Sequence, residues 1–346
     1  MLKFVSAVTQ SNFRRLNSPF KLSYAVTYRC NLKCKMCNIW NKEHVQNELN
    51  ADDIGRFFGK PHQVYWLGIT GGEPFLRNDL PEIVDAALAP SPSLRALHFA
   101  TNGTLTSRIE HLVHATKKKH KKVKIVFTLS VDGPPELHDR IRGARDVWAN
   151  MFRTFAFLKK IDGVKPQFGF TLSHENIDKF EDTFLAMRAA YPQLRFDDVT
   201  VNIFQRSSFY YDNHGMAPLD ADEVARQIKK ILKMDKDKLS LNNFLRRRYL
   251  QLYLKFLKTR KSPVKCQSLA STCFLDPYGN LFPCAVYNKK LLNIKDTMLS
   301  LKEIWRLKEA GTIHQECAAN KCPSCWSPCD AYSAIGGSIL QSMVAS

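Results

Sequence analysis

Long uninterrupted hydrophobic runs are missing from this sequence of 346 residues. No window approaches the roughly 18 uncharged apolar residues that a membrane-spanning helix requires. The apolar run at the N-terminus is too short for the core of a signal peptide, and arginines lie directly after it. Low-complexity stretches and a long disordered tail are absent as well. These absences predict a cytoplasmic protein without a membrane partner.

Acidic side chains are also in short supply, with 32 Asp and Glu residues against 51 Lys and Arg residues and a formal net charge of +19. Such a balance indicates attraction to something acidic, namely nucleic acid, a membrane surface or an acidic redox protein. A solvated basic surface without any partner explains it equally well. The densest run, "KKKHKK" at 117–122, lies where a helix is expected to end, and cations stabilise the helix dipole there.

The ten cysteines are not expected to form disulfides, because thiols are kept reduced in the cytosol. Clustered cysteines in such a protein are typical of metal or iron–sulfur ligands. The hydrophobic content of 45% and the charged content of 24% are ordinary for a globular enzyme. The chain is long enough for a barrel and a smaller additional domain.

Apolar, β-branched runs alternate with helical segments over the first two thirds of the chain. Six strands are expected, at 22–28, 64–70, 96–100, 123–131, 167–172 and 199–204. Helices are expected to separate and follow them, near 51–59, 79–89, 106–119, 146–161, 176–190 and 220–234. This alternation favours a parallel sheet covered by helices, and hence an α/β fold with a partial (β/α)6 TIM-like barrel. A doubly wound open sheet is the alternative.

The polar motifs gather at one end of the expected sheet. Three cysteines within 30–37 follow the first strand, and "GGEP" at 71–74 follows the second. "TNG" at 101–103 and "SVDG" at 130–133 follow the third strand and end the fourth. Parallel α/β folds build their active sites at the carboxyl ends of the strands. The shared position therefore predicts one site made from all these motifs.

The alternation ends near residue 242. A stretch at 242–261 has apolar residues at helical spacing among basic ones; we favour the buried side of a connecting helix over a nucleic-acid-facing one. Beyond it lie seven cysteines without a regular pattern: Cys266, Cys273, Cys284, Cys317, Cys322, Cys325 and Cys329. A small segment that buries little apolar surface is commonly held together by metal. We expect an N-terminal extension (1–21), a barrel (22–241) and a cysteine-rich C-terminal domain (242–346).

The spacing of Cys30, Cys34 and Cys37 is unusual for a structural metal site. Structural zinc sites pair Cys-x2-Cys with a second pair far along the chain. C-x3-C-x2-C in one loop can instead give three thiolates to three irons of a four-iron cluster. The fourth iron then lacks a protein ligand. An open position on a metal indicates a reactive centre rather than a structural one.

These cysteines, together with "GGEP" after the next strand, resemble the radical S-adenosylmethionine (SAM) superfamily. The resemblance implies that the open iron of a [4Fe-4S] cluster binds S-adenosylmethionine. One electron then cleaves it to methionine and a 5′-deoxyadenosyl radical, which takes hydrogen from a substrate. The resemblance also implies the residues that bind this cosubstrate: Gly71, Gly72, Glu73, Ser130 and Arg142.

Each of these residues has an expected role. Gly71 and Gly72 are expected to let the main chain approach the methionine moiety, and Glu73 to accept a hydrogen bond from its amino group. Ser130 and Arg142 are expected to meet the ribose or the carboxylate. No catalytic acid or base is assigned, because the polar residues at 132–139 suit capping and salt-bridge roles equally well.

The tail resembles the C-terminal SPASM or shorter twitch region of radical SAM enzymes, which holds one or two auxiliary iron–sulfur clusters. "LDPYGNLFPC" at 275–284 matches the small hairpin of that region. Seven cysteines cannot fully ligate two four-iron clusters, which need eight. The first hypothesis places one cluster on Cys266, Cys273, Cys284 and Cys329 and a second on Cys317, Cys322 and Cys325, the latter with an open site or an oxygen ligand such as Asp330. The competing hypotheses are a single cluster on Cys273, Cys284, Cys322 and Cys325, and zinc.

The resemblance implies hydrogen abstraction from a peptide, a protein or a small metabolite. It also implies an electron donor, and the basic charge favours an acidic flavodoxin or ferredoxin. Ala285 stands where sulfatase-maturing relatives have an acidic residue after the "PC" element, so that activity is not expected. The residues before position 22 give no support for a separate peptide-binding domain, and the loop at 205–215 is a candidate substrate-facing segment.

Two other functions stay open. An RNA-modifying radical SAM enzyme is one, although the basic charge is its only motive. A non-catalytic iron–sulfur protein for electron transfer or scaffolding is the other, and such a protein would need neither the "GGE" element nor an open iron.

Overall fold

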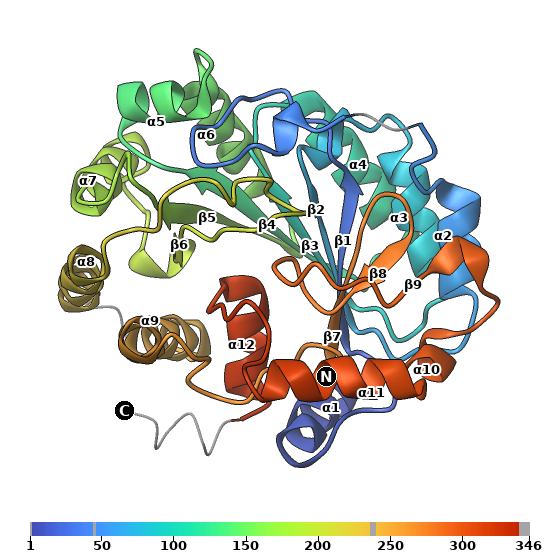
Figure 1. Ribbon diagram of the computed structural model, residues 1–346. Helices are drawn as coiled ribbons and strands as arrows, with labels where there is room; N and C mark the ends of the chain where they lie inside the picture. Colours follow the sequence, from blue (N-terminus) through green and yellow to red (C-terminus); the bar gives the residue numbers. More distant parts are fainter. Residues whose placement is uncertain (1, 44–45, 236–239, 339–346) are drawn as a thin grey trace.

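Nine strands form one sheet in the part of the chain that the computed structural model describes, residues 2–43, 46–235 and 240–338 (Figure 1). The strands are β1 (Lys21–Thr27), β2 (Trp66–Gly71), β3 (Ala96–Thr101), β4 (Lys124–Val131), β5 (Val164–Leu172), β6 (Val199–Ile203), β7 (Thr272–Leu275), β8 (Asn280–Phe282) and β9 (Leu292–Asn293). Their order is β6-β5-β4-β3-β2-β1-β7-β8-β9. Strands β1 to β6 run parallel in chain order. A doubly wound sheet reverses its order partway, so the prediction of a six-stranded partial barrel is confirmed.

Helices follow the barrel strands and cover the outside of the sheet (Figure 1). The six predicted ones are α2 (Ala51–Phe58), α3 (Leu80–Leu88), α4 (Thr106–Lys119), α6 (Val147–Leu158), α7 (Phe180–Ala190) and α8 (Ala221–Met234). Helix α7 begins four residues later than predicted. The reason is Asn176, whose side chain accepts the N–H of Ser173 at 2.7 Å and donates to the carbonyl of Asp132 at 2.8 Å. These bonds hold the start of the predicted helix in a turn.

Fully buried phenylalanines hold the helices against the sheet. Phe99 and Phe127, on neighbouring strands, stack with ring centroids 5.1 Å apart, and Phe75 packs on Phe99 at 5.7 Å. On the neighbouring strand β5, Phe168 stacks on Phe155 of helix α6, with ring centroids 4.3 Å apart. Each such side chain contributes about 1.5–3 kcal/mol when it leaves water. This packing fixes where the carboxyl ends of the strands lie.

Two helices that precede the tail were not predicted. Helix α1 (Leu2–Phe13) precedes the barrel and is tied to the tail by Asn12, which donates to the carbonyl of Gly336 at 3.0 Å. Helix α5 (Pro135–Arg142) follows β4 and ends at Gly143, whose φ of 73° is left-handed. Prolines at its start and a glycine at its end are ordinary helix boundaries. Its eight residues are too few for the apolar periodicity by which longer helices are recognised.

The tail continues the barrel sheet instead of forming a separate one. Strand β7 pairs in parallel with β1, and β7 and β8 form the predicted hairpin around Gly279, which has a φ of 93°. The remaining helices are α9 (Leu241–Thr259), α10 (Leu301–Ile304), α11 (Lys308–Ala318) and α12 (Pro328–Gly336). Short 3-10 helices are η1 (Ile39–Asn41), η2 (Pro74–Leu76), η3 (Phe196–Asp198) and η4 (Ile294–Asp296). Within the described ranges, every helix is too short or too polar to span a membrane.

Helix α9 is the predicted connecting helix, and its apolar stripe is buried. Tyr249 and Tyr253 are almost fully shielded from water. Trp326 of the tail donates to the carbonyl of Tyr249 at 3.1 Å. Arg246 on the same helix is buried in an ion pair with Asp235, 2.7 Å away. These contacts support the structural interpretation of this basic stretch.

Candidate functional site

The loop after β1 brings the three predicted cysteines together. Cys34 is buried with Leu32 and Val147, and Cys30 and Cys37 pack against the same apolar cluster. The N–H of Cys37 donates to the carbonyl of Cys34 at 3.1 Å, which closes the turn between them. Burial raises the pKa of Cys30 and of Cys37 to about 12. Thiolates at these positions therefore need a strongly bound cation, and a set of three thiols suits the three irons of an open cluster.

The two glycines of "GGEP" lie directly on the backbone of the cysteine loop. A Cβ on Gly71, whose φ is +143°, would lie 2.1 Å from the carbonyl oxygen of Thr27, and one on Gly72 would lie 2.2 Å from that of Arg29. Gly72 and Glu73 donate their N–H groups to these same carbonyls, at 2.9 and 2.8 Å. The sequence predicted glycine at these two positions because the main chain should approach the methionine moiety of the cosubstrate. The structure shows a second reason, which is the close contact between the end of β2 and the cysteine loop.

Glu73 is completely buried and connects "GGEP" to "TNG". Its carboxylate accepts the Thr101 hydroxyl and the Asn102 N–H, both at 2.8 Å, and the N–H of Phe75 at 3.2 Å. Burial nevertheless raises the pKa of this carboxyl to about 7. A carboxylate offers about four acceptor positions, so three donors leave room for one more. The predicted bond from the cosubstrate's amino group to Glu73 remains a proposal.

"SVDG" and α5 together place a buried ion pair beside the cysteines. Arg142 pairs with Asp132, and its Nη1 lies 3.6 Å from Sγ of Cys34. The Nε of Arg142 is buried without a hydrogen-bond partner among the described residues. An unpaired buried donor costs about 1–3 kcal/mol, and a bound cluster or cosubstrate would supply an acceptor. The donor set therefore fits the implied group. Ser130 lies half-buried on β4 opposite Gly169, and its predicted role also remains a proposal.

Five tail cysteines lie close together in the structure. The neighbouring thiol of Cys322 raises the pKa of Cys317, and the thiol of Cys284 raises the pKa of Cys325. The charges of Cys284 and Asp330 act on the pKa of Cys266, which burial raises to about 12. The residues linked by these electrostatic interactions are Cys266, Cys284, Cys317, Cys322, Cys325 and Asp330, although no three of the described residues are arranged to hold a single metal ion.

Cys273 lies apart from this set. It is on β7 opposite Leu22 of β1, in the main hydrophobic core, and burial alone raises its pKa. Among the tail thiols that the structure describes, it therefore has no neighbour, although both hypotheses from the sequence included it. A position on a buried strand explains its apolar surroundings. The side chain of Cys329 lies outside the described residues.

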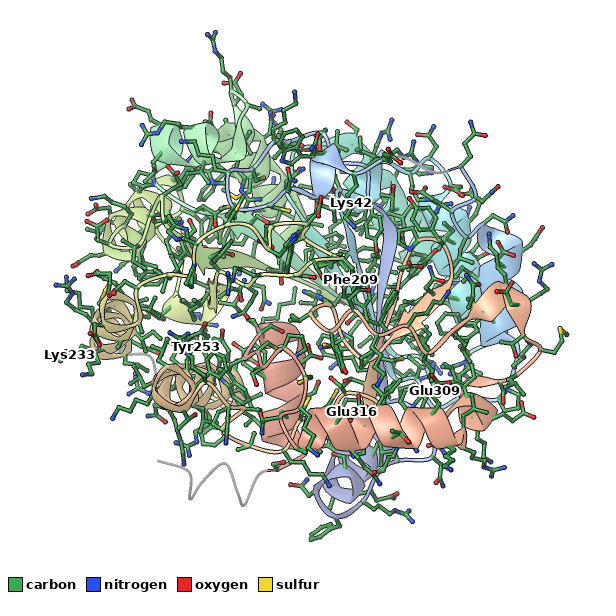
Figure 2. The ribbon with its side chains drawn as sticks, in the orientation of Figure 1. Lys42, Phe209, Lys233, Tyr253, Glu309 and Glu316 are labelled. Atoms are coloured by element: carbon green, nitrogen blue, oxygen red, sulfur yellow. The ribbon has the colours of Figure 1, made fainter. Side chains whose placement is uncertain are left out.

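The loop 205–215 contacts both the cysteine loop and the tail, a role that the sequence did not predict. Asn213 donates to the carbonyl of Met36 at 3.0 Å, and the N–H of Asn38 donates to the carbonyl of Tyr211 at 2.9 Å. Lys42 donates to the carbonyl of Phe209; Figure 2 labels both residues, which belong to the segment after the cysteine loop and to the loop 205–215. The paired serines and tyrosines of "SSFYYDN" are the only sequence feature that hints at these contacts.

Tyr210 joins this loop to the end of β2. Its hydroxyl is 2.8 Å from the hydroxyl of Thr70 and donates to the carbonyl of Gly71 at 3.2 Å. Its ring packs on Phe274 of β7 at 5.1 Å. One side chain thus contacts the glycine element, the barrel strand that carries it, and the tail.

Residues 24–187 match the model of the "Radical SAM superfamily". Fe-coproporphyrin III synthase of Methanosarcina barkeri is 34% identical over 44% of this chain and 37% of that protein. The subtilosin biosynthesis protein AlbA of Bacillus subtilis is 23% identical over 91% of this chain and 68% of AlbA. Mycofactocin maturase MftC of Mycolicibacterium smegmatis is 29% identical over 51% of this chain and 44% of MftC. The chain thus spans less than half the length of two of these relatives.

A solved structure shares the fold. Streptococcus suis SuiB bound to precursor peptide SuiA aligns with a TM-score of 0.61 at 17% identity, over 88% of this chain and 68% of SuiB. At this identity the likeness shows the fold alone. It includes the tail as well as the barrel, because the aligned part is longer than the barrel.

An open parallel α/β barrel with three thiols gathered after its first strand is the scaffold of an enzyme with an iron–sulfur cofactor. Residues 24–187 are a radical SAM domain, and the similarity to AlbA, over 91% of this chain, extends into the cysteine-rich tail. The non-catalytic alternative is therefore wrong. The cofactors are a [4Fe-4S] cluster, S-adenosylmethionine and one or two auxiliary iron–sulfur clusters. Together they supply an electron and a carbon radical that removes hydrogen from a substrate.

Proposed function

We propose that the enzyme abstracts hydrogen from a peptide or protein that binds at the carboxyl ends of the barrel strands. The share of this chain that each relative matches favours a peptide substrate over a porphyrin substrate. Similarity to the bacteriocin biosynthesis protein AlbA spans 91% of this chain and includes the tail. Similarity to the coproporphyrin enzyme spans 44%. The likeness to the peptide-bound SuiB covers 88%.

Aromatic side chains form the proposed wall of the substrate site. Tyr28 of the cysteine loop packs edge-on against Tyr278 of the hairpin at 5.8 Å. Phe209 of the loop 205–215 stacks on Phe282 at 4.5 Å. Phe209, Tyr211 and Tyr278 are only partly buried, so their rings can meet a bound molecule. Binding sites are commonly apolar and aromatic with a few polar groups, and this wall suits an apolar peptide side chain.

The residues of the chain have distinct proposed roles. Cys30, Cys34 and Cys37 hold the primary cluster. Glu73 fixes the "TNG" loop beside it and keeps one acceptor position for the cosubstrate. The loop 205–215 excludes water by covering the space between the cysteine loop and the tail.

We also propose a single auxiliary cluster in the tail. Five thiols and one carboxylate exceed the four ligands of one cubane but fall short of the eight that two would need. Its four ligands are proposed to come from Cys266, Cys284, Cys317, Cys322 and Cys325, and Asp330 is an alternative oxygen ligand. Iron and sulfide counts on anaerobic protein test this: about eight irons mean two cubanes in total, and about twelve would mean a second auxiliary cluster.

The substrate proposal is tested with the reconstituted enzyme, S-adenosylmethionine and a reductant. Peptides encoded beside its gene, iron coproporphyrin III and tRNA are offered separately. We expect a mass change in a peptide together with 5′-deoxyadenosine above the substrate-free background, and neither in a Cys34→Ala variant. Turnover confined to the porphyrin or to tRNA would assign that substrate class instead.

The electron donor is proposed to be an acidic flavodoxin or ferredoxin, on the basis of the net charge of +19. Attraction between a basic enzyme and an acidic donor weakens as salt screens it. Turnover driven by flavodoxin should therefore fall as ionic strength rises, whereas turnover driven by dithionite should not. Equal salt dependence with both reductants contradicts this docking.

A further inference from the structure

The guanidinium of Arg142 contacts a cluster ligand, although the resemblance predicted a contact with the cosubstrate. Its Nη1 lies 3.6 Å from Sγ of Cys34, and its Nη2 is paired with Asp132. Both terminal nitrogens are therefore occupied. The side chain is almost completely buried, at 11% exposure, so water does not compete strongly for these contacts.

Asp132 is held so firmly that it fixes the direction of Arg142. Its Oδ1 accepts the N–H of Thr171 at 3.2 Å, and its own N–H donates to Nδ1 of the buried His138 at 3.0 Å. Asn176 donates to its carbonyl at 2.8 Å. The rigid, planar guanidinium has few orientations that keep the Asp132 ion pair. Its other edge is thereby directed at Cys34.

We propose that Arg142 is a positioning residue that donates a hydrogen bond to the Cys34 thiolate and raises the reduction potential of the primary cluster. Hydrogen bonds to the sulfurs and net charge are two of the factors that set the potential of an iron–sulfur cluster. A donor stabilises the reduced form more than the oxidised form, because reduction adds negative charge to the sulfurs. Asp132 limits this effect, because its carboxylate offsets the charge of Arg142. This inference does not depend on the substrate proposed above.

Redox titration of the cluster without S-adenosylmethionine, followed by electron paramagnetic resonance, tests the proposal. The primary cluster is identified as the signal that changes when S-adenosylmethionine is added. Arg142→Gln should shift its midpoint potential to a more negative value. Asp132→Asn keeps an acceptor oxygen that holds Arg142 in place and should shift the potential to a more positive value, because the charge of Arg142 is then uncompensated. Arg140→Gln, on the exposed side of the same helix, is the matched control and should leave the potential unchanged.

Opposite shifts in the two variants cannot come from a general loss of structure. A midpoint potential in Arg142→Gln equal to that of the wild type, with weaker binding of S-adenosylmethionine, would overturn the proposal and assign Arg142 to the cosubstrate. If Arg142→Gln fails to retain iron, the midpoint potential of Asp132→Asn by itself tests the proposal. A negative shift or no shift in that variant overturns the proposal.

Discussion

The hydroxyl of Ser207 donates a hydrogen bond to the carbonyl oxygen of Ala285, 2.8 Å away. Ser207 belongs to the loop after β6, and Ala285 directly follows the "PC" element of the tail. The same loop bonds to the cysteine loop through Asn213. The barrel, the cluster loop and the tail therefore meet at one continuous set of contacts.

Tyr210→Phe should loosen this junction without unfolding the protein. The variant keeps the ring packing and loses the hydroxyl that bonds to Thr70 and to the carbonyl of Gly71. We expect a loss of about 1 kcal/mol in the free energy of unfolding and weaker binding of S-adenosylmethionine. Urea denaturation and calorimetry measure the two effects. Tyr191→Phe, whose hydroxyl bonds only to an exposed glutamine, is the control; equal losses in both variants contradict a special role for Tyr210.

Gly72→Ala should prevent the cysteine loop from closing on β2. Its Cβ would lie 2.2 Å from the carbonyl oxygen of Arg29, a main-chain atom that cannot move aside without displacing the loop. We expect a loss of at least about 2 kcal/mol in stability and poor incorporation of iron. Gly215→Ala is the control, because a Cβ there meets nothing within 4 Å. Normal iron content in Gly72→Ala would show that the loop adapts.

Cys273→Ala should keep its full complement of iron, whereas replacement of Cys284, Cys322 and Cys325 together by alanine, which leaves two of the five neighbouring thiols, should lose about four irons per chain. Cys273 lies in the hydrophobic core on β7, whereas the thiol of Cys284 raises the pKa of its neighbour Cys325. Iron and sulfide analysis measures the difference. A loss of iron in Cys273→Ala would restore this residue to the ligands, as the sequence alone predicted.

Glu73 should make the cluster-free protein less stable as the pH rises. Burial raises its pKa from an ordinary 4.5 to about 7, so between these values the folded state keeps a proton that the unfolded state has released. Its contribution to stability is full below about pH 4.5 and is lost as the pH rises through 7, by at most about 3 kcal/mol.

Urea denaturation at pH 5 and pH 8 measures this effect. The difference in stability between the two pH values should be smaller in Glu73→Gln than in the wild type. Glu82→Gln, at an exposed position in the first turn of α3, should retain the wild-type difference. An unchanged difference in Glu73→Gln would assign the pH dependence to another group.

The barrel could be predicted because its signals are local. The apolar periodicity of 22–234 located all six strands and six helices, and the end of each strand located the motifs. Pairing of β7 with β1 could not be predicted, because it joins residues about 250 positions apart and "TCFL" is too short to identify a strand. The hydrogen bond between Ser207 and Ala285 could not be predicted for the same reason, because these residues are also far apart in the sequence.

The site was predicted in its residue types more than in its contacts. Spacing identified the three thiols, the glycines and the buried acid of "GGEP". It could not show that Gly72 packs on the backbone of Arg29. Nor could it show that the guanidinium of Arg142 contacts both Asp132 and Cys34. These contacts depend on how three loops fold over one another. Cys273 could not be separated from the other tail cysteines, since only its position on a buried strand distinguishes it.

Strand β1 is hydrogen-bonded along both edges, by β2 on one side and by β7 on the other, from Lys21 to Tyr24. An uncovered strand edge is a template for pairing with another chain. A protein cut before residue 266 would expose that edge on the very strand that leads to Cys30. The tail therefore also protects the enzyme against aggregation, and damage to the tail that releases β7 would favour insoluble protein over a merely less active one.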